Sequence, residues 1–546
     1  MNITELIYQN ANLFPNRKAV IAPIAYDMCG RITYAHYTFR QFVSESENLS
    51  LHLKKCGIHP GTKVLLFVKP SLEFSLLVFS LFALGAVPVL IDPGVGRKNL
   101  LEAIEKVKPE VLIAEPIVHL LRRVYFKYFA SVRVFITTQS PSFFTSQLSL
   151  QSFIKQKNFE KISLQTLSAD SVAAIVYTSG ATGIPKGVVY THGMFAQQVH
   201  LLKKIIPLNG EDVDISCFPL FSLFSISLGM SSVIPWLDAS KPISVNPEFI
   251  LRHIRDHGVT LGTGSPAIWE RVADYCLQKQ ETLDSLRGIM MFGAPVSLSL
   301  HEKLRDVCPN GNTFTPYGAT ECLPVSWISG REILKNHARK MKEGTGTCIG
   351  SIVEETEVEI IPTFFDAISV VEKLPAYEIG EIIVSGQQVT REYFENPEET
   401  KRAKIFDGEK LWHRMGDLGY KDAEGLLWFY GRKSHRVIAG DQPYYPIPCE
   451  AIFNQHAKVK RSALISIEED FPALVIERVD KKVSLSQEER LTFKKELLEM
   501  GKKFQHTKKI KNFFLYDDFP VDCRHNIKID RIFLSQYFIQ NKEFRL

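Results

Sequence analysis

The segment from Val64 to Ala114 alternates between short apolar runs that predict strands and longer runs that predict helices. The apolar runs predict strands over Val64–Val68, Val87–Ile91 and Val111–Ala114. Between them, the patterns predict helices over Ser71–Leu84 and Lys98–Lys106. Because strands that alternate with helices usually form parallel sheets covered by those helices, this part of the chain predicts an α/β fold.

The chain is long enough to form more than one domain. It has 546 residues, and its hydrophobic fraction of 45% supplies a sizeable core. After Gly380 the apolar runs become shorter, and Gly431–Ser434 forms a polar break. The lysine-rich remainder contains short strand patterns and a helical pattern near Gln487–Met500. We therefore predict a large N-terminal domain over residues 1–431 and a small α+β domain over residues 432–546.

Charge and cysteine content argue against several classes of function. The net charge of +5 is small, and basic runs such as Lys508–Lys511 are short and interrupted, which is typical of a solvated surface and not of nucleic-acid binding. The nine cysteines include no CxxC pair, and no His cluster has metal-ligand spacing. We therefore expect neither a disulfide framework nor a zinc site, and we expect a reducing, cytoplasmic compartment.

No stretch has the pattern of a targeting signal or a membrane span. The N-terminal residues MNITELIYQNANLFP carry Glu5 and lack a basic leader, so they predict an amphipathic helix and not a signal peptide. The apolar run Ser75–Ile91 is divided by Gly85 and Pro88 into a buried helix and a short strand. A second run, Phe218–Trp236, is also interrupted by Ser, Gly and Pro. We expect no transmembrane segment.

The stretch from Ala173 to His192 joins an apolar run to a loop with the composition of a phosphate site. Glycines let the backbone approach a ligand closely, while hydroxyl and ammonium groups donate hydrogen bonds to phosphate oxygens. The glycines are Gly180, Gly183 and Gly187, and the other candidate phosphate ligands are Thr178, Ser179, Thr182 and Lys186.

This loop differs from a Walker P-loop, in which Gly precedes the Lys and a helix follows. Here Pro185 precedes Lys186, and Val188–Tyr190 predicts a second strand. We therefore predict that the loop joins two strands and closes over phosphates as a flap. An ordinary glycine-rich hairpin is the alternative.

Two further strand-to-loop junctions are predicted at Ile289–Val296 and Thr313–Glu321. In open α/β sheets, ligands bind outside the carboxyl ends of the strands. These junctions are therefore the expected walls of a site.

Several motifs occur in an order and spacing that together are highly specific. They are YTSGATGIPKGV, PYGATE (Pro316–Glu321), GEIIVSG (Gly380–Gly386), GDLGY (Gly416–Tyr420), Gly431-Arg432 and KIDR (Lys528–Arg531). On these motifs, essentially the whole chain resembles the adenylate-forming (ANL) superfamily of acyl-CoA synthetases, peptide-synthetase adenylation domains and luciferases. The resemblance implies a large N-terminal domain of mostly parallel sheets and a small C-terminal lid domain, joined by a hinge.

The resemblance also implies the first chemical step. A substrate carboxylate attacks the α-phosphorus of ATP and gives an acyl-adenylate and pyrophosphate, so the protein mainly positions groups and neutralises phosphate charge. The loop Thr178–Lys186 would hold the β- and γ-phosphates, and Thr320 would contact the α-phosphate. Glu321, with Thr178, would hold Mg²⁺, a hard ion suited to oxygen ligands. A carboxylate at a helix N-terminus is the alternative for Glu321.

Nucleoside contacts follow from the same resemblance. Tyr317 would stack on adenine. The backbone of the two residues that follow it, Gly318 and Ala319, and that of a second segment, Gly293, Ala294 and Pro295, would line the base. Asp417 would accept both ribose hydroxyls, and Arg432 would donate to the ribose or a phosphate. The alternative for these two is a plain ion pair at the domain junction. Lys528, carried by the small domain, would stabilise the pentacoordinate transition state.

The chain departs from the superfamily where other members line a tunnel for the pantetheine thiol. The hinge residue, usually Asp or Lys, is Ser434, and in the following loop Ile438 replaces a Lys while Asp441 replaces a Gly. Pro448 replaces the first Glu of a later motif, of which Glu450 is retained. A carboxylate in a tunnel for phosphopantetheine is unfavourable, so these changes argue against CoA thioester formation.

Other strings resemble one branch of the superfamily, the OleC-type β-lactone synthetases of long-chain olefin biosynthesis. They are LIDPGVGRKNL, FPLFSLFSISLGMSSVIP, WHRMGDLGY, LWFYGRK and FPVDCRHNIKIDR. This resemblance implies that a 2-alkyl-3-hydroxy acid is adenylated, and that its own β-oxygen then closes a β-lactone with release of AMP. It also implies a long-chain acyl substrate and a possible assembly with other enzymes of that pathway.

Two other functions stay open from the sequence. The general motifs also suit a long-chain fatty acyl-CoA synthetase or a fatty acyl-AMP ligase, and an inactive acyl or nucleotide sensor is an alternative of another class. The run Phe218–Trp236, with Trp269, would either line an alkyl chain or pack in the core.

Overall fold

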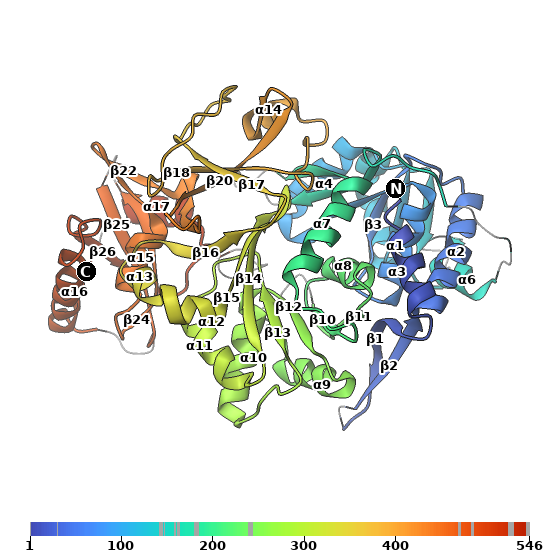
Figure 1. Cartoon of the computed structure of the whole chain (residues 1–546), viewed down its shortest axis with the longest axis horizontal. Helices are drawn as coiled ribbons and strands as arrows, with labels where there is room; N and C mark the ends of the chain where they lie inside the picture. Colours follow the sequence, from blue (N-terminus) through green and yellow to red (C-terminus); the bar gives the residue numbers. More distant parts are fainter. Residues whose placement is uncertain are drawn as a thin grey trace.

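The computed structural model describes most of the chain. The described residues are 2–29, 31–140, 146, 148–157, 160, 164–178, 185–238, 244–467, 471–481, 485–521, 529–541 and 546. Figure 1 shows two packed sheet regions with their helices and a smaller C-terminal region at one end of the molecule.

A parallel sheet with covering helices forms the N-terminal third of the chain. Its centre consists of β3 (Lys63–Phe67), β4 (Val87–Ile91) and β5 (Val111–Ala114), which pair in parallel in the order β4-β3-β5. The connecting helices are α3 (Leu72–Leu84) and α4 (Arg97–Val107). The predicted α/β alternation is therefore confirmed, with β4 and β5 at the predicted bounds.

The same sheet ends on a hairpin. Its strand order is β7-β6-β5-β3-β4-β8-β9. The outer strands are β6 (Val134–Thr137), β7 (Leu148–Ser149), β8 (Val172–Thr178) and β9 (Lys186–Thr191). The pair β8–β9 is antiparallel. Helix α7 (His192–Ile205) follows directly, because the Thr191 side chain caps its N-terminus by accepting from the backbone N–H of Met194.

A larger sheet occupies the middle of the molecule. Its parallel part consists of β1 (Lys18–Tyr26), β11 (Ser231–Val233), β10 (Val213–Ser216), β12 (Leu261–Gly264), β13 (Gly288–Met291) and β14 (Asn312–Ala319), in that order. Beyond β14 the sheet continues antiparallel through β15 (Cys322–Ser329), β16 (Thr347–Ile352), β21 (Leu427–Arg432), β20 (Lys410–Lys421), β18 (Gly380–Ser385) and β17 (Glu357–Ile361). Two edge strands, β2 (Ile32–Thr38) and β19 (Lys404–Asp407), pair with β1 and β20.

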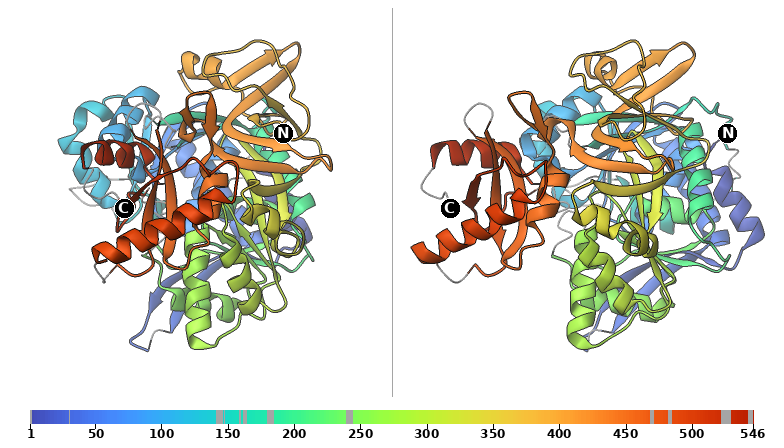
Figure 2. Two further views of the ribbon diagram at one scale, coloured as in Figure 1. Left: turned by 90° about the vertical axis from the view of Figure 1, so that its left-hand side faces the viewer. Right: turned by 60° about the vertical axis from the view of Figure 1, so that its left-hand side comes forward.

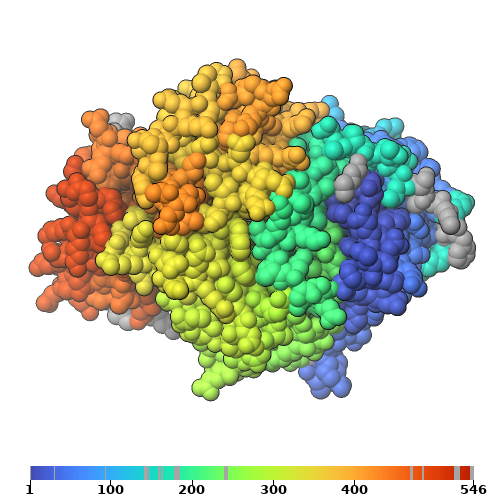
Figure 3. Space-filling model, viewed as in Figure 1, coloured from blue at the N-terminus to red at the C-terminus, as the bar shows by residue number. Residues whose placement is uncertain are grey.

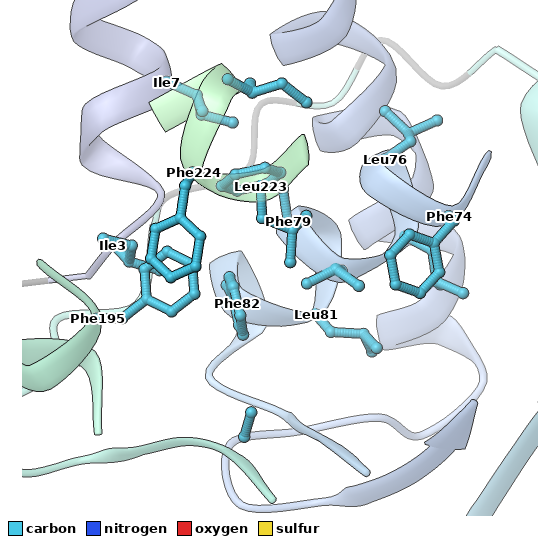
Figure 4. Packing of buried hydrophobic residues seen from close by; sticks show 14 of the residues in the cluster. Ile3, Ile7, Phe74, Leu76, Phe79, Leu81, Phe82, Phe195, Leu223 and Phe224 are labelled. Atoms are coloured by element: carbon cyan, nitrogen blue, oxygen red, sulfur yellow. The ribbon is translucent and has the colours of Figure 1, made fainter. Parts of the chain in front are cut away.

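The largest core cluster lies between these sheets and around α3. Apart from Glu73 in its first turn, every residue of this mostly apolar helix is buried. Figure 4 shows its aromatic residues packed with side chains of α1 (Glu5–Leu13), α7 and α8 (Phe221–Ser227). Phe195 and Phe224 stack there with ring centroids 4.7 Å apart. Ser75–Ile91 is therefore a buried helix and a strand, as predicted, and no helix in the described ranges is long and apolar enough to cross a bilayer.

The remaining helices cover the sheets. They are α2 (Phe39–Lys55), α5 (Pro116–Val124), α6 (Leu150–Lys155), α9 (Pro247–His257), α10 (Pro266–Lys279), α11 (Leu298–Val307), α12 (Gly330–Glu332), α13 (Ala338–Lys342) and α14 (Pro397–Ala403).

The C-terminal region forms a small α+β unit. Strands β24 (Val459–Ile467), β25 (Phe471–Arg478) and β26 (Asn512–Leu515) form one sheet, and β22 (Val437–Ala439) pairs with β23 (Gln442–Tyr444). Its helices are α15 (Pro446–Phe453), α16 (Gln487–Lys502) and α17 (Arg531–Gln540). Figures 2 and 3 show this region at one end of the molecule. Its α+β character is as predicted, while the division at residues 431/432 stays a prediction.

A buried ion network lies where the chain leaves the large sheet. Glu381 in β18 is fully buried, and its carboxylate pairs with Arg414 at 2.6 Å and with Lys433 at 2.8 Å. Arg414 is 3% exposed. Lys433 is the first residue after β21, so this network holds the start of the C-terminal segment against β18 and β20.

We predict that Glu381→Gln destabilises the protein by about 3–5 kcal/mol, because the buried Arg414 and the half-buried Lys433 lose their counter-charge. The free energy of unfolding, measured from urea titration, checks this. Glu357→Gln is the control, since Glu357 is 53% exposed in its pair with Lys410 and is worth at most about 1 kcal/mol. An equal loss in both variants would contradict the prediction.

Candidate active site

The β8–β9 hairpin carries the glycine-rich loop. Thr178 and Lys186 are register partners at the loop end of the hairpin, so the loop joins two strands, as predicted. The predictions for Ser179, Gly180, Thr182 and Gly183 concern residues outside the described ranges, and only the backbone of Thr178 is described. Gly187 is required by packing, because a Cβ there would lie 2.9 Å from the Tyr177 ring.

Lys186 lies between a carboxylate and an aromatic ring. Its Nζ is 2.5 Å from Oε2 of Glu399, in the first turn of α14, and 5.3 Å from the ring centroid of Tyr393. The segment before α14 packs along β9, since Val188 bridges to Tyr393 and the Phe394 N–H donates to the Gly187 carbonyl at 2.7 Å.

Thr320 and Glu321 form the turn of the β14–β15 hairpin, between the paired residues Ala319 and Cys322. The Tyr190 hydroxyl donates to the Thr320 carbonyl at 2.5 Å, and the Thr390 N–H donates to the Glu321 carbonyl at 2.9 Å. Because strand β15 follows directly, the alternative of a helix N-terminal carboxylate at Glu321 is wrong.

Tyr393 connects this turn to Lys186. Its hydroxyl donates to Oε1 of Glu321 at 2.8 Å, while its ring faces the Lys186 ammonium. Burial, and next the negative charge of Glu321, raise the pKa of Tyr393, so the hydroxyl stays protonated and remains a donor. Sequence reasoning missed Tyr393 and Glu399, because each lies in a stretch without a chemical motif and reaches the site only through the fold. Tyr190 was predicted only as part of a strand, because nothing local indicates that its hydroxyl reaches the Thr320 carbonyl.

A second group of predicted residues meets at the β14, β20 and β21 strands. The Tyr317 hydroxyl donates to Oδ2 of Asp417 at 2.7 Å, and Nη1 of Arg432 lies 3.0 Å from Oδ1 of the same carboxylate. Burial, followed by the Asp417 charge, raises the pKa of Tyr317, and Asp417 raises the pKa of Arg432. Asp417 and Arg432 therefore do form an ion pair, between neighbouring strands of one sheet.

The two groups belong to one electrostatic environment. Besides Asp417, the charge of Glu321 contributes to the raised pKa of Arg432. The hairpin turn that carries Glu321 therefore lies near the Asp417–Arg432 pair.

The predicted base-lining strip follows β13. Gly293 and Pro295 are exposed, and Gly293 has φ of 91°, which favours glycine. Because β13 is the neighbour of β14, this strip continues the edge on which Tyr317 lies. Gly318 is needed in β14, since a Cβ there would lie 2.7 Å from the Cys322 carbonyl.

The aromatic residues near this strip divide into two kinds. Phe218 and Phe221 contact Phe292, with ring centroids 5.7 Å and 5.4 Å apart, and Phe292 immediately precedes Gly293. Trp269 is fully buried in a separate core cluster. Core packing therefore accounts for Trp269.

The structure places the C-terminal residues that differ from the superfamily pattern. Ser434 is exposed in a short 3₁₀ turn, and Asp441 is exposed at the turn of the β22–β23 hairpin. Glu450 in α15 accepts from the Leu464 N–H at 2.7 Å and pairs with Arg531 at 2.5 Å. Its retention is explained by this structural role. Lys528 lies outside the described residues.

The donor set suits a nucleotide-borne magnesium ion better than a resident metal. Among the described residues, no group of three or more His, Cys, Asp or Glu side chains is placed to hold a metal. Mg²⁺ with a nucleotide usually takes one or two carboxylates together with substrate phosphates. Glu321, a carboxylate at a hairpin turn near Lys186, fits that requirement.

Comparisons with known proteins show the family of the chain. A family profile described as "AMP-binding enzyme" matches residues 7–394. The chain is 36% identical to an olefin β-lactone synthetase of Xanthomonas campestris pv. campestris over 99% of this chain and 98% of that protein. It is also 36% identical to an olefin β-lactone synthetase of Stenotrophomonas maltophilia, over 90% of this chain and 89% of that protein.

Solved structures show the same fold. The O-succinylbenzoate coenzyme A synthetase of Bacillus subtilis, in complex with ATP and a magnesium ion, superposes with a TM-score of 0.74 at 22% identity. The match covers 96% of this chain and 98% of that structure. With the profile match, the near full-length relatives and the site geometry together, the chain belongs to the family of AMP-binding enzymes.

Proposed function

We propose that this chain is an ATP-dependent β-lactone synthetase that acts on a long-chain 2-alkyl-3-hydroxy acid. The observation that carries the proposal is the 36% identity to an olefin β-lactone synthetase over 99% of the chain. The likeness to the CoA synthetase structure, at 22% identity, supports the fold alone. An acyl-CoA or acyl-AMP ligase is the alternative within the family.

In the first step, the carboxylate oxygen of the substrate bonds to the α-phosphorus of ATP, and the bond to pyrophosphate breaks. Lys186 and the loop from Thr178 bind the β- and γ-phosphates, and Thr320 contacts the α-phosphate. Glu321 and Thr178 hold Mg²⁺, which neutralises phosphate charge when bound. Tyr393 keeps the Glu321 carboxylate oriented by its hydrogen bond of 2.8 Å.

The nucleoside binds at the second group. Asp417 already accepts from Tyr317 and pairs with Arg432, so its carboxylate is held in place before ribose arrives. Two ribose hydroxyls then share this carboxylate, and the Tyr317 ring supplies a face for adenine. The strip Gly293–Pro295, together with Gly318 and Ala319, approaches the base through its backbone.

In the second step, the β-hydroxyl oxygen of the bound acyl-adenylate attacks its own carbonyl carbon. The hydroxyl proton passes to solvent water, the bond from the acyl carbon to the AMP oxygen breaks, and a four-membered lactone, AMP and the released proton remain. Holding nucleophile and carbonyl in one molecule removes the need for a second substrate tunnel. The exposed Asp441 and Ser434 are consistent with a chain that has no such tunnel.

The remaining parts of the proposal concern the acyl chain and the lid. Phe218, Phe221 and Phe292 form an aromatic wall that suits an alkyl chain. We propose that residues 432–546 act as a lid that brings Lys528 to the α-phosphate.

We predict that the purified protein converts a synthetic 2-alkyl-3-hydroxy acid, ATP and Mg²⁺ into a β-lactone and AMP, and that added CoA leaves the rate of AMP release unchanged. Proton NMR of the extracted product and a coupled AMP assay measure both. Formation of acyl-CoA in place of lactone would establish the alternative ligase. Absence of AMP release from this acid, with or without CoA, would indicate a binding protein.

We also predict that Tyr393→Phe raises the Mg²⁺ concentration for half-maximal rate about tenfold, because Glu321 loses a partner that orients it. The substitution keeps the ring beside Lys186. Rates are measured over a Mg²⁺ titration at saturating substrate, with Glu392→Gln as the control, since Glu392 is exposed. An unchanged Mg²⁺ dependence in Tyr393→Phe would contradict the role of Tyr393 in orienting Glu321 at the metal.

A further inference from the structure

Lys186 does not point freely toward a ligand. Its ammonium is engaged by the Glu399 carboxylate at 2.5 Å, and the two side chains are only 17% and 21% exposed. Glu399 lies 213 positions further along the chain, so the contact depends on α14 packing against β9.

Glu399 is held firmly in its charged form. The Asn396 side chain caps α14 by accepting from the Glu399 N–H at 3.3 Å, and Arg402 pairs with Oε1 at 3.0 Å. Burial raises the pKa of Glu399, but the hydrogen bond and the positive charge of Lys186 outweigh this effect and bring that pKa below its usual value. The carboxylate is therefore ionised at neutral pH and carries a fixed negative charge beside the phosphate loop.

A triphosphate that takes the Lys186 ammonium must compete with this carboxylate. It also meets the repulsion of the Glu399 charge. The exchange leaves no stranded charge, because Arg402 remains bonded to Glu399 after Lys186 has moved. The pair is thus built to open when phosphate arrives and to close when it leaves.

We propose that Glu399 is a counter-ion that competes with the β- and γ-phosphates of ATP, and with pyrophosphate, for Lys186. It lowers the affinity of the site for both and favours release of pyrophosphate after adenylation. This inference rests on the proposed phosphate-binding role of Lys186.

The chain supplies a matched control in the preceding residue. Glu398 lies in the same turn of α14 and carries the same charge, but it is exposed. Glu398→Gln therefore removes one negative charge from the same helix without touching Lys186.

The test measures dissociation constants of ATP, pyrophosphate and AMP by calorimetry in the presence of Mg²⁺, using the full-length protein. Glu399→Gln is expected to tighten ATP and pyrophosphate about fivefold, since a part-buried pair of this kind is worth about 1 kcal/mol. AMP binding stays unchanged, because AMP has no β- or γ-phosphate. Glu398→Gln alters none of the three constants.

Weaker or unchanged ATP and pyrophosphate binding in Glu399→Gln would overturn the inference, as would an equal change in AMP binding. Lys186→Met separates this failure from failure of the proposed function. If Lys186→Met leaves pyrophosphate binding unchanged, the phosphate role of Lys186 is wrong and the inference falls with it. If Lys186→Met weakens pyrophosphate binding and Glu399→Gln does not tighten it, only the counter-ion role is wrong. In the double variant the gain from Glu399→Gln is expected to shrink.

Discussion

The hydrogen bond from Tyr393 to Glu321 joins the two hairpins on which the site is built. The β14–β15 turn presents Glu321, and the β8–β9 hairpin presents Lys186. Tyr393 touches both, with its hydroxyl on one and its ring beside the other. Phosphate chemistry needs a metal-binding carboxylate and a cation at a fixed separation, and a single buried tyrosine provides that constraint here.

The segment that contains Tyr393 also supplies the carboxylate that pairs with Lys186. Tyr393 lies just before α14, and Glu399 lies in the first turn of that helix. The segment that contains Tyr393 packs along β9. Glu399 neutralises Lys186 when no phosphate is present. Asp417 is likewise already paired with Arg432. In both cases, a charged side chain that would contact the ligand is paired with an opposite charge of the protein before binding. Ligand binding therefore replaces one ion partner by another and leaves no unpaired buried charge.

Local patterns predicted the fold well, because they depend on neighbouring residues. The spacing of apolar residues predicts the bounds of β4 and β5 and the burial of α3. Turn residues predict that the glycine-rich loop joins two strands. The Tyr393–Glu321 contact spans 72 positions and the Lys186–Glu399 pair spans 213, so no local pattern could predict them. The motif residues Tyr317, Asp417 and Arg432 do meet, but their mutual bonds depend on the register of β20 against β21 and on the strand order that brings β14 near them.

The central claim is that the carboxylate of a β-hydroxy acid is adenylated and that its own hydroxyl then closes the ring. The most direct measurement uses substrate labelled with ¹⁸O in both carboxylate oxygens, followed by mass spectrometry of AMP and lactone. Activation at the carboxylate predicts one labelled oxygen in AMP and one in the lactone, at its carbonyl. AMP without label and a lactone that retains both labelled oxygens would contradict the account, because the hydroxyl would then have been the activated group.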